Sequence, residues 1–469
     1  MSTELIYSDA TKLAELIRTR EVSPVEVMKA HLDRIEAVNP QVNAIVTIVE
    51  DALESASKAE AAVQRGDELG PLHGVPFTVK DSIDTAMVPT QRGTPIFKGR
   101  TPDADATSVA RMKRAGGILL AKTNLPEFSY GIESDNLLSG RTNNPWNLDL
   151  TPGGSSGGES AAIAAGMSPL GLGTDLAISL RGPAAHTGIV SLKATHGRVP
   201  MTGIWPREPR RFWHVGPMAR SIRDLSLAFS LLAGPDGQDG YSSSAIPIDN
   251  GTGSFLERPL RVGWLVEPGF GPVDLETAST VEAAAEALKN LGHTVESVRI
   301  TALERDFALD VFTRMSVLEM KPGFVATTAG HSEDEIGNMA RFLLSTPDTL
   351  AADYIDAVQG ADRLKDGYAE YFQKYDVLLT PVLPTPSFKH GQQELLINGQ
   401  TVNILGIMSA TTPLNVTGLP GVSMRFGTSR DGMPIGVQIV GSWHAESTIL
   451  RVASLLEQSS PPLDLHPNV

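Results

Sequence analysis

Two adjacent serines, Ser155 and Ser156, lie in a glycine-rich stretch that reads TPGGSSGGESAAIAAG (151–166). Glycine loses more conformational freedom on folding than any other residue, so several glycines in front of a helix-forming segment need a local reason. A close approach of the backbone to another group is such a reason. A serine hydroxyl held at that point could serve acyl transfer if a base activates the nucleophile.

The stretch also matches G-x-S-x-G at residues 153–157, the pattern of a nucleophile elbow. An elbow needs a strand before the serine and a helix after it. GESAAIAAG (158–166) predicts the helix, but NNPWNLDLTP (143–152) reads as a loop. The elbow is therefore disfavoured, and because no lysine follows the glycines, a phosphate-binding P-loop is disfavoured as well.

A second serine-hydrolase pattern is present in fragments. Residues 55–58 satisfy S-x-x-K and residues 134–136 satisfy S-D-N, but the third motif, K-T-G, is replaced by Lys-His-Gly at 389–391. Ser55 and Lys58 lie on a charged, alanine-rich helix, which is typical of a solvated face. No histidine after the serine pair lies in a diagnostic setting; these are His186, His196, His214, His293, His331, His390, His444 and His466.

Lys80 is the candidate base. It ends the apolar segment VPFTVKD (75–81), which predicts a strand that could bury it. A lysine pKa lies near 10.4 in water, and desolvation lowers it because burial disfavours the charged form. The residues alone leave a second interpretation open, in which Lys80 is a surface lysine paired with Asp81.

Several long, ordered segments resemble the amidase signature family. These are LHGVPFTVKD (72–81), AGGILLAKTNLPEFSYG (115–131), the glycine-rich stretch, GLGTDLAISLRGPAAHTGIVSLKATHGRV (171–199), GPMARSIRDLSLAFSLLAG (216–234) and residues 412–453. The resemblance covers nearly the whole chain. It implies the α/β amidase signature fold, with a central mixed β-sheet covered by helices on both faces.

The resemblance assigns roles residue by residue. Lys80 matches the family's catalytic lysine, Ser155 the serine that follows a cis peptide bond, and Ser179 the nucleophile. The backbone N–H groups of the turn match the oxyanion hole, with supporting residues around it; this set comprises Leu176, Ala177, Ile178 and Ser179, supported by Ser156, Asp175 and Arg181. Neutral Lys80 would take a proton from Ser155, which would take one from Ser179. One oxyanion donor is worth roughly 3 to 4 kcal/mol.

Two segments depart from the family's usual pattern or stand out. Ala177-Ile178 replaces the usual Gly-Gly before the nucleophile. Isoleucine at positive φ would be an outlier, so we expect Ile178 to keep an ordinary φ and its side chain to line the space beside the attacked carbonyl. The Trp- and Arg-rich segment 204–213 is either an aromatic-anchored loop or a pocket wall for an aromatic or anionic substrate.

The elements alternate as in an α/β protein. Ser23, Pro24 and Glu26 predict a capped helix start, and Asn39-Pro40 predicts its end. Further helices are predicted at 51–65, 107–117, 277–292 and 445–458, and strands at 74–80, 118–123, 260–266, 376–381, 421–427 and 434–442. Residues 234–256 read as a long surface loop. We expect one domain over 1–469, with N-terminal helices at 1–70, the signature core at 71–235 and the remaining sheet and helices at 236–469.

Composition narrows the function classes. The 469 residues carry 39 Lys and Arg against 54 Asp and Glu, a net charge of −15, which disfavours nucleic acid or an anionic membrane as a partner. The absence of cysteine excludes disulfides, thiol catalysis and cysteine-ligated zinc. The N-terminus lacks a signal-peptide apolar segment and no apolar run is long enough to span a membrane. We expect a cytoplasmic enzyme without a cofactor or catalytic metal.

The resemblance implies a hydrolase of carboxylic amides, with anilides, carbamates and esters as further substrates of the same acyl chemistry. Two alternatives remain: the glutaminase (A) subunit of a tRNA-dependent amidotransferase, and a catalytically silent binding relative. Intact Lys80, Ser155 and Ser179 argue against the silent relative. We expect a small amide or carbamate as the partner and a monomer or homodimer.

Overall fold

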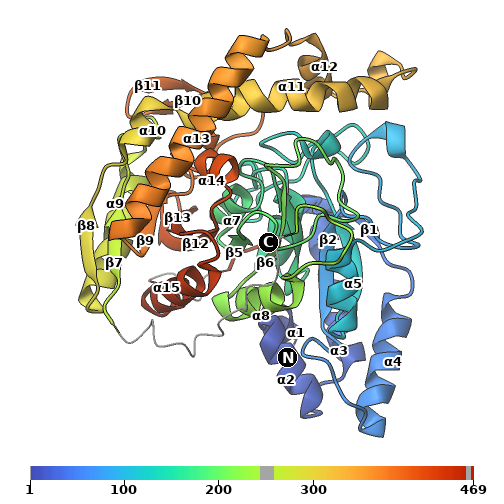
Figure 1. Ribbon diagram of the computed structural model, residues 1–469. Coiled ribbons are helices and arrows are strands. Elements are labelled where there is room, and N and C mark those ends of the chain that lie inside the picture. Colours follow the sequence, from blue (N-terminus) through green and yellow to red (C-terminus); the bar gives the residue numbers. More distant parts are fainter. Residues whose placement is uncertain (1, 243–257, 461–465) are drawn as a thin grey trace.

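The fold is built on one large mixed β-sheet. The computed structural model describes residues 2–242, 258–460 and 466–469 (Figure 1). Over these residues, eleven strands pair in the order β1-β3-β2-β4-β6-β5-β12-β13-β9-β7-β8, and β10 and β11 form a separate hairpin. The sheet strands are β1 (Ile45–Ile48), β2 (Pro76–Lys80), β3 (Ile118–Thr123), β4 (Leu170–Asp175), β5 (Val190–Lys193), β6 (His214–Ala219), β7 (Arg261–Trp264), β8 (Thr294–Ser297), β9 (Val377–Pro381), β12 (Gly421–Thr428) and β13 (Pro434–Gly441). The hairpin strands are β10 (Glu394–Ile397) and β11 (Gln400–Asn403).

Helices flank the strands throughout. They are α1 (Ser2–Tyr7), α2 (Ala10–Arg18), α3 (Pro24–Val42), α4 (Ala52–Arg65), α5 (Thr107–Arg114), α6 (Gly157–Ala164), α7 (Arg181–Thr187), α8 (Ile222–Leu232), α9 (Leu275–Asn290), α10 (Thr301–Arg305), α11 (Ala308–Thr328), α12 (Asn338–Ser345), α13 (Ala351–Lys374), α14 (Thr412–Thr417) and α15 (Glu446–Ser459). In β3, β4 and β13 every residue is buried. Since alternate side chains point to opposite faces, both faces of the sheet are covered, as predicted.

The strands with the candidate chemistry lie inside the sheet. β2 pairs in parallel with β3 on one side and with β4 on the other, so a neighbouring strand flanks β2 on each side. A proline in a strand is usually confined to an edge or to the first residue, because it has no N–H to donate. Pro76 is the first residue of β2, where a missing N–H is tolerated, and the strand itself is internal.

The predicted elements are largely confirmed, but several boundaries differ by one to three residues, as at the end of α5 (Arg114 instead of 117) and at the end of α3. The capping box of Ser23 and Glu26 is present, but α3 runs through Pro40 to Val42 instead of ending before it. The reason is a left-handed cap one turn later, at Asn43, which has φ 52° and donates from its N–H to Asn39 O. Asn39 Oδ1 accepts from the N–H groups of Ala44 and Ile45, which satisfies the backbone beyond the helix.

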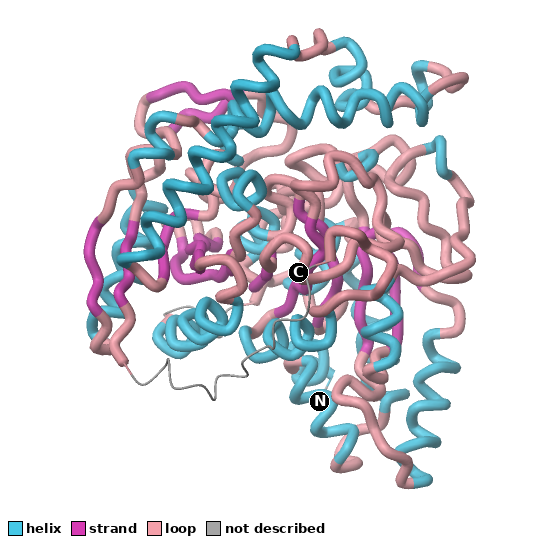
Figure 2. Tube along the Cα trace, viewed as in Figure 1, coloured by secondary structure: helices cyan, strands magenta, loops and turns pink. Residues whose placement is uncertain are grey.

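Helices α11 and α12 lie at the top of the view in Figure 2, away from most of the strands, whereas α13 runs from there down the side of the molecule toward β9 (Figure 1). Most of the predicted surface loop at 234–256 falls in 243–257, outside the described residues; positions 234–242 form turns and bends. Within the part of the chain that the structure describes, no helix combines the length and the hydropathy that a membrane crossing needs.

Candidate active site

The glycines of the stretch 151–166 lie where two segments of main chain approach each other closely. The Gly154–Ser155 peptide bond is cis. A Cβ added at Gly154 would lie 2.6 Å from Glu133 N and 2.7 Å from Gly131 O, and one added at Gly158 would lie 2.5 Å from Asn124 N. Because these neighbours are main-chain atoms that cannot swing away, only glycine fits. The expected close approach is thus to the protein's own backbone, which holds Ser155 in place.

Lys80 reaches Ser155 from the end of β2. Its side chain is completely buried, and Nζ lies 2.6 Å from Ser155 Oγ and 2.8 Å from Thr174 Oγ1. Among the described residues it forms no ion pair. Asp81, by contrast, approaches the ammonium of Lys122 at 3.5 Å and accepts from two main-chain N–H groups. The interpretation of Lys80 as a surface lysine paired with Asp81 is therefore wrong.

Burial dominates the ionisation of Lys80. Desolvation lowers the pKa of this lysine well below its usual value, and the carboxyl groups of Asp175 and Glu159 oppose the shift. Glu159 is itself buried, and burial raises its pKa to about 8, although hydroxyl donors on Thr78 and Thr123 act in the opposite direction. Near neutral pH the carboxyl group is therefore largely protonated, and a lysine with a lowered pKa is able to act as a base.

The turn after β4 carries Ser179. Within the described chain the main-chain N–H groups of residues 176–179 donate no hydrogen bond, whereas the next one, on Leu180, donates to Asp175 Oδ2 at 3.0 Å. Ser179 is 4% exposed, and its Oγ has no hydrogen-bond partner among the same residues. The φ of Ile178 is not positive, which confirms the expectation of an ordinary conformation.

A buried ion pair holds this turn. Arg181 Nη2 and Nε donate to Asp175 at 2.9 and 3.0 Å, and both side chains are fully buried. Burial alone would raise the pKa of Asp175, but Arg181 and the hydrogen bonds outweigh it and hold that pKa below its usual value. Asn415 accepts from Arg181 and donates to Asp175, while Gln438 accepts from Arg181 at 3.0 Å. The bracing predicted for Asp175 and Arg181 is thus extended by two residues from late in the chain.

Ser156 links the serine loop to the same strand. Its Oγ donates to Thr174 O at 3.1 Å and accepts from Thr174 N at 3.3 Å. Thr174 also contacts Lys80, so one residue of β4 positions both the lysine and the loop. This arrangement fits the supporting position expected for Ser156.

A cleft of about 630 Å³ is lined by the segment that packs against Gly154, although Lys80, Ser155 and Ser179 are not among its lining residues. Its wall includes Gly131, Ile132 and Glu133, whose backbone lies against Gly154, together with the hairpin segment around His390. The carboxylate of Glu133 accepts from Gly391 N and lies 3.0 Å from His390 Nδ1, which ties the two walls together.

Ile178 packs into an apolar cluster next to the cleft. The cluster comprises Ile178, Ala185, Val382, Leu383, Phe388, Leu395, Ile397, Ile404 and Ile407, with Ile132 and Leu405 packed against it. Ile132, Ile404 and Leu405 also line the cleft. The space beside the turn is therefore apolar on the side of Ile178.

Other sequence candidates lie elsewhere. Lys58 has a 70% exposed side chain paired with Glu54, as expected for a solvated helix face, and Ser134 bonds to Gly153 and Gly157 as a loop brace. No strand precedes the serine loop, so the elbow pattern is not realised. In the Trp- and Arg-rich segment, Phe212 and Trp213 are buried, and Trp205 packs on Phe97 and Phe128, which makes it an aromatic-anchored loop.

Residue patterns missed four contributors: Thr174, Glu159, Asn415 and Gln438. Thr174 and Glu159 lie inside the matched segments but have side chains that carry no chemical signature. Asn415 and Gln438 lie 234 and 257 residues from Arg181 in the chain. Only the sheet order brings them to it. Among the described residues, no group of three or more His, Asp or Glu side chains could hold a metal ion.

Comparison with known proteins places this geometry in a family. The Amidase family model matches residues 26–450. The A subunit of glutamyl-tRNA(Gln) amidotransferase from Carboxydothermus hydrogenoformans is 33% identical over 97% of this chain and 98% of its own, and that from Symbiobacterium thermophilum is 34% identical over 95% of each. Among solved structures, 6-aminohexanoate cyclic dimer hydrolase in complex with substrate superposes with a TM-score of 0.88 at 30% identity over 99% of both chains. A bacterial aryl acylamidase has a TM-score of 0.87 at 27% identity over 97% of this chain and 96% of its own. The chain belongs to the amidase signature family, whose members act on carbon–nitrogen bonds.

Proposed function

We propose that the protein hydrolyses carboxylic amides through an acyl-enzyme on Ser179, with Ser155 and Lys80 as a proton relay. The contact between Lys80 Nζ and Ser155 Oγ, 2.6 Å long and fully buried, carries the proposal. A lysine without a carboxylate partner and with a lowered pKa is suited to be neutral and to accept a proton.

The relay conserves protons at each step. Ser179 Oγ attacks the carbonyl carbon and gives its proton to Ser155 Oγ, whose own proton passes to Lys80 Nζ. When the tetrahedral intermediate collapses, Ser155 gives a proton to the leaving nitrogen and regains one from Lys80. Water then attacks the acyl-enzyme by the same route, which releases the carboxylic acid and restores Ser179. The Ser155–Ser179 contact is the link that must close when substrate binds.

The four free N–H groups of residues 176–179 are the proposed oxyanion donors. Donors that are already oriented and not otherwise engaged cost no reorganisation when charge develops on the carbonyl oxygen. Asp175 binds the N–H of Leu180 instead, so the ion pair with Arg181 fixes the turn without occupying those donors. This division of roles supports Asp175 and Arg181 as positioning residues.

The apolar surroundings of Ile178 favour substrates with an apolar group next to the scissile bond. Anilides, other aryl amides, carbamates and esters share the acyl chemistry and are proposed as substrates. A free amino acid amide would place charged groups against these side chains, which costs free energy unless they find partners.

The glutaminase subunit of a tRNA-dependent amidotransferase is the second candidate. Curated relatives described as amidotransferase A subunits, 33 and 34% identical over nearly the whole chain, favour it. The solved A subunit from Thermotoga maritima superposes less closely, with a TM-score of 0.75 at 26% identity over 93% of this chain and 92% of its own. This difference and the apolar cluster at Ile178 favour the stand-alone amidase.

The purified chain alone tests both candidates. We expect turnover of at least one anilide, aryl carbamate or ester, with little release of ammonia from glutamine. Mass spectrometry after reaction with a fluorophosphonate should locate the adduct on Ser179, and Ser179→Ala should remove both label and turnover. Glutamine hydrolysis that appears only with co-purified partner subunits would support the amidotransferase. A label on Ser55 or Ser134, or inactivity on every substrate together with an unreactive Ser179, would contradict the proposal.

A further inference from the structure

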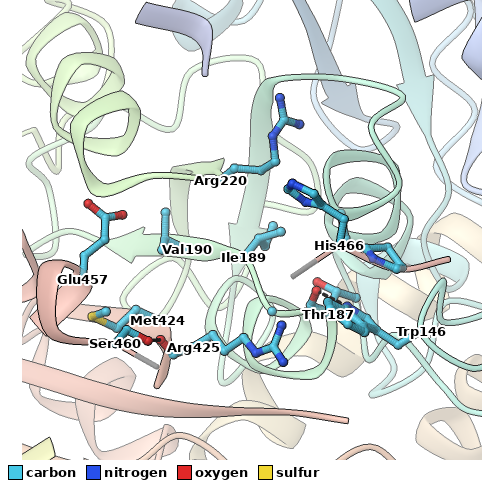
Figure 3. A pocket seen from close by; sticks show the side chains of 13 residues that line it. Trp146, Thr187, Ile189, Val190, Arg220, Met424, Arg425, Glu457, Ser460 and His466 are labelled. Atoms are coloured by element: carbon cyan, nitrogen blue, oxygen red, sulfur yellow. Dashed lines mark hydrogen bonds between the residues drawn. The ribbon is translucent and has the colours of Figure 1, made fainter. Parts of the chain in front are cut away.

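A second, smaller cavity lies apart from the serine loop. It has a volume of about 90 Å³ and none of Lys80, Ser155 and Ser179 lines it (Figure 3). Its walls come from the end of α7, from β5 and β12, and from chain near the C-terminus. Since an apolar cavity of about 150 Å³ holds a benzene molecule, this space suits a ligand of roughly three to five heavy atoms.

Arg425 supplies a buried positive charge to this cavity. The residue is 7% exposed, yet no carboxylate lies within ion-pair distance of it among the described residues. Its Nε donates to Gly427 O at 3.3 Å and Nη2 to Thr428 Oγ1 at 2.8 Å. In the same described chain, Nη1 has no hydrogen-bond partner. The guanidinium therefore has one unused pair of donors at the cavity.

The position of the guanidinium is fixed on its other sides. Its Cζ lies 4.5 Å from the centroid of the Trp146 ring, and Trp146 Nε1 donates to Thr187 O at 2.7 Å, which holds the ring. The pairing of β12 with β13 shifts register between Arg425 and Gly427. Such bulges re-aim side chains at the sites where they occur. The local backbone and the tryptophan together direct Arg425 toward the cavity.

Within the described residues, no carboxylate pairs with the positive charge at the cavity. Burial lowers the pKa of Arg425 to about 10, so the side chain remains cationic at neutral pH. Arg220 adds a second cation, although its Nη atoms already donate to main-chain carbonyls. Glu457 lines the cavity, but Figure 3 shows its carboxylate directed away from Arg425, and burial raises its pKa. A buried cation of this kind is stabilised by an anion.

We propose that this cavity binds a small monocarboxylate, with the carboxylate on Arg425 and a short apolar tail against the remaining wall. Guanidinium groups bind carboxylates in a planar, charge-assisted geometry. The tail would meet apolar side chains that include Ala164, Ile189, Val190 and Met424. The size of the space suits a ligand of the acetate or propionate class. Nothing in this inference depends on the reaction at Ser179.

Calorimetric titration of the full chain with sodium acetate and sodium propionate, at constant ionic strength set with chloride, tests the site. We expect saturable binding with one ligand per chain. Arg425→Met should weaken it about tenfold or more, the loss expected for one hydrogen bond to a charged group. Arg430→Met is the matched control, because Arg430 lies in the turn of the same hairpin with a 92% exposed side chain; it should leave binding unchanged.

Two further variants keep the test sharp if Arg425→Met folds poorly. Arg425→Lys retains the positive charge but loses the paired N–H donors of the guanidinium. Trp146→Phe keeps an aromatic face but loses the hydrogen bond to Thr187. Both variants should weaken binding while their circular dichroism spectra stay native. Ser179→Ala should bind as the parent does, which separates this cavity from the cleft. Equal affinity in Arg425→Met, loss of binding in Ser179→Ala, or tighter binding of inorganic phosphate than of acetate would overturn the proposal.

Discussion

At the scale of single residues, the candidate chemistry depends on which charges are buried without partners. Lys80 has only hydroxyl neighbours within hydrogen-bond distance, whereas the equally buried Lys122 lies near Asp81. Burial lowers the pKa of both, to about 8 for Lys122 and well below its usual value for Lys80. The carboxylate of Asp81 thus distinguishes two buried lysines on neighbouring strands: Lys122, which lies near it, is a structural cation, and Lys80 is the candidate base.

We expect amide turnover to rise with pH through the lowered pKa of Lys80. Below that pKa the side chain is charged and cannot accept a proton, so kcat/KM should fall as the pH drops. Lys80→Ala should abolish turnover while circular dichroism remains native. Lys58→Ala, which removes an exposed lysine, is the control and should behave as the parent. Near-parental activity of Lys80→Ala would show that another group is the base.

Ile178→Gly should change which acyl groups are accepted more than it changes the rate on a small ester. The substitution removes a side chain from the apolar cluster beside the turn but keeps the N–H of residue 178. We expect relative kcat/KM values across a series of acyl chain lengths to shift toward bulkier groups. The same fractional loss for every acyl group would instead mean that the turn itself has been disturbed.

Glu159→Gln should flatten the pH dependence of stability. The pKa of Glu159 is about 8 in the folded chain against 4.5 in the unfolded one, so its favourable contribution is complete below 4.5 and is lost as the pH rises toward 8. Between pH 5 and 8 the variant should gain up to about 4 kcal/mol relative to the parent. Urea unfolding at both pH values measures this, and a constant difference would contradict the raised pKa.

At the scale of elements, glycine decides how closely α6 packs on the sheet. Gly158 faces the backbone of Asn124, just beyond β3, and Gly171 on β4 faces the carboxyl of Glu159. The helix that begins directly after the serine loop is therefore fixed against the strands around Lys80. Because these contacts are with main chain or with a buried carboxyl, small shifts of the neighbouring atoms cannot relieve the clash that a larger side chain would cause.

Gly158→Ala and Gly323→Ala should have opposite effects on stability. Both glycines are helical, but an added Cβ at Gly158 lies 2.5 Å from Asn124 N, whereas one at Gly323 in α11 meets nothing within 4 Å. We expect Gly158→Ala to destabilise by about 3 kcal/mol or more, as overpacking does, and Gly323→Ala to stabilise by about 0.5 to 1 kcal/mol. Thermal unfolding of both variants measures the direction of each change in stability. Destabilisation by Gly323→Ala would contradict the expected opposite effects.

The sequence predicted elements well where local signals were complete. The capping box at Ser23 and the glycine cap at Gly66 mark their helix ends correctly. The end of α3 was misplaced because Pro40 suggested a stop while Asn43 supplied the actual cap. The free N–H groups of the turn, and the position of Glu159 beneath Lys80, follow from strand packing and have no local signal.

At the scale of the whole molecule, the site combines an early part of the chain, residues 80–181, with a late part, residues 411–438. β5 and β12 are neighbours in the sheet, so the segment after residue 410 packs against the turn that follows β4. Arg181 donates to Thr411 O, Asn415 and Gln438 as well as to Asp175. Family resemblance located the serines and the lysine, but no spacing in the sequence indicates these long-range partners.

Asn415→Ala should cost both stability and rate. The substitution removes one buried hydrogen bond to the charged Arg181 and one to the charged Asp175, which keep their contact with each other, and we expect this loss to destabilise by about 1 to 3 kcal/mol. Because the turn loses its support, kcat should fall more than KM rises. Asn338→Ala, at an exposed residue paired with Arg341, is the control and should change stability by less than about 0.5 kcal/mol. A KM effect alone would assign Asn415 to substrate binding.

The distance in sequence between Arg181 and its partners has a consequence for synthesis on the ribosome. The strands around Lys80, Ser155 and Ser179 leave the exit tunnel first. The guanidinium of Arg181, which braces the turn that carries Ser179, has hydrogen-bond partners at residues 411, 415 and 438, and these emerge 230 to 257 residues later. We therefore expect a nascent or prematurely terminated chain to be inactive even when it contains all three candidate side chains. On this proposal, activity would appear only after the last strands have been translated.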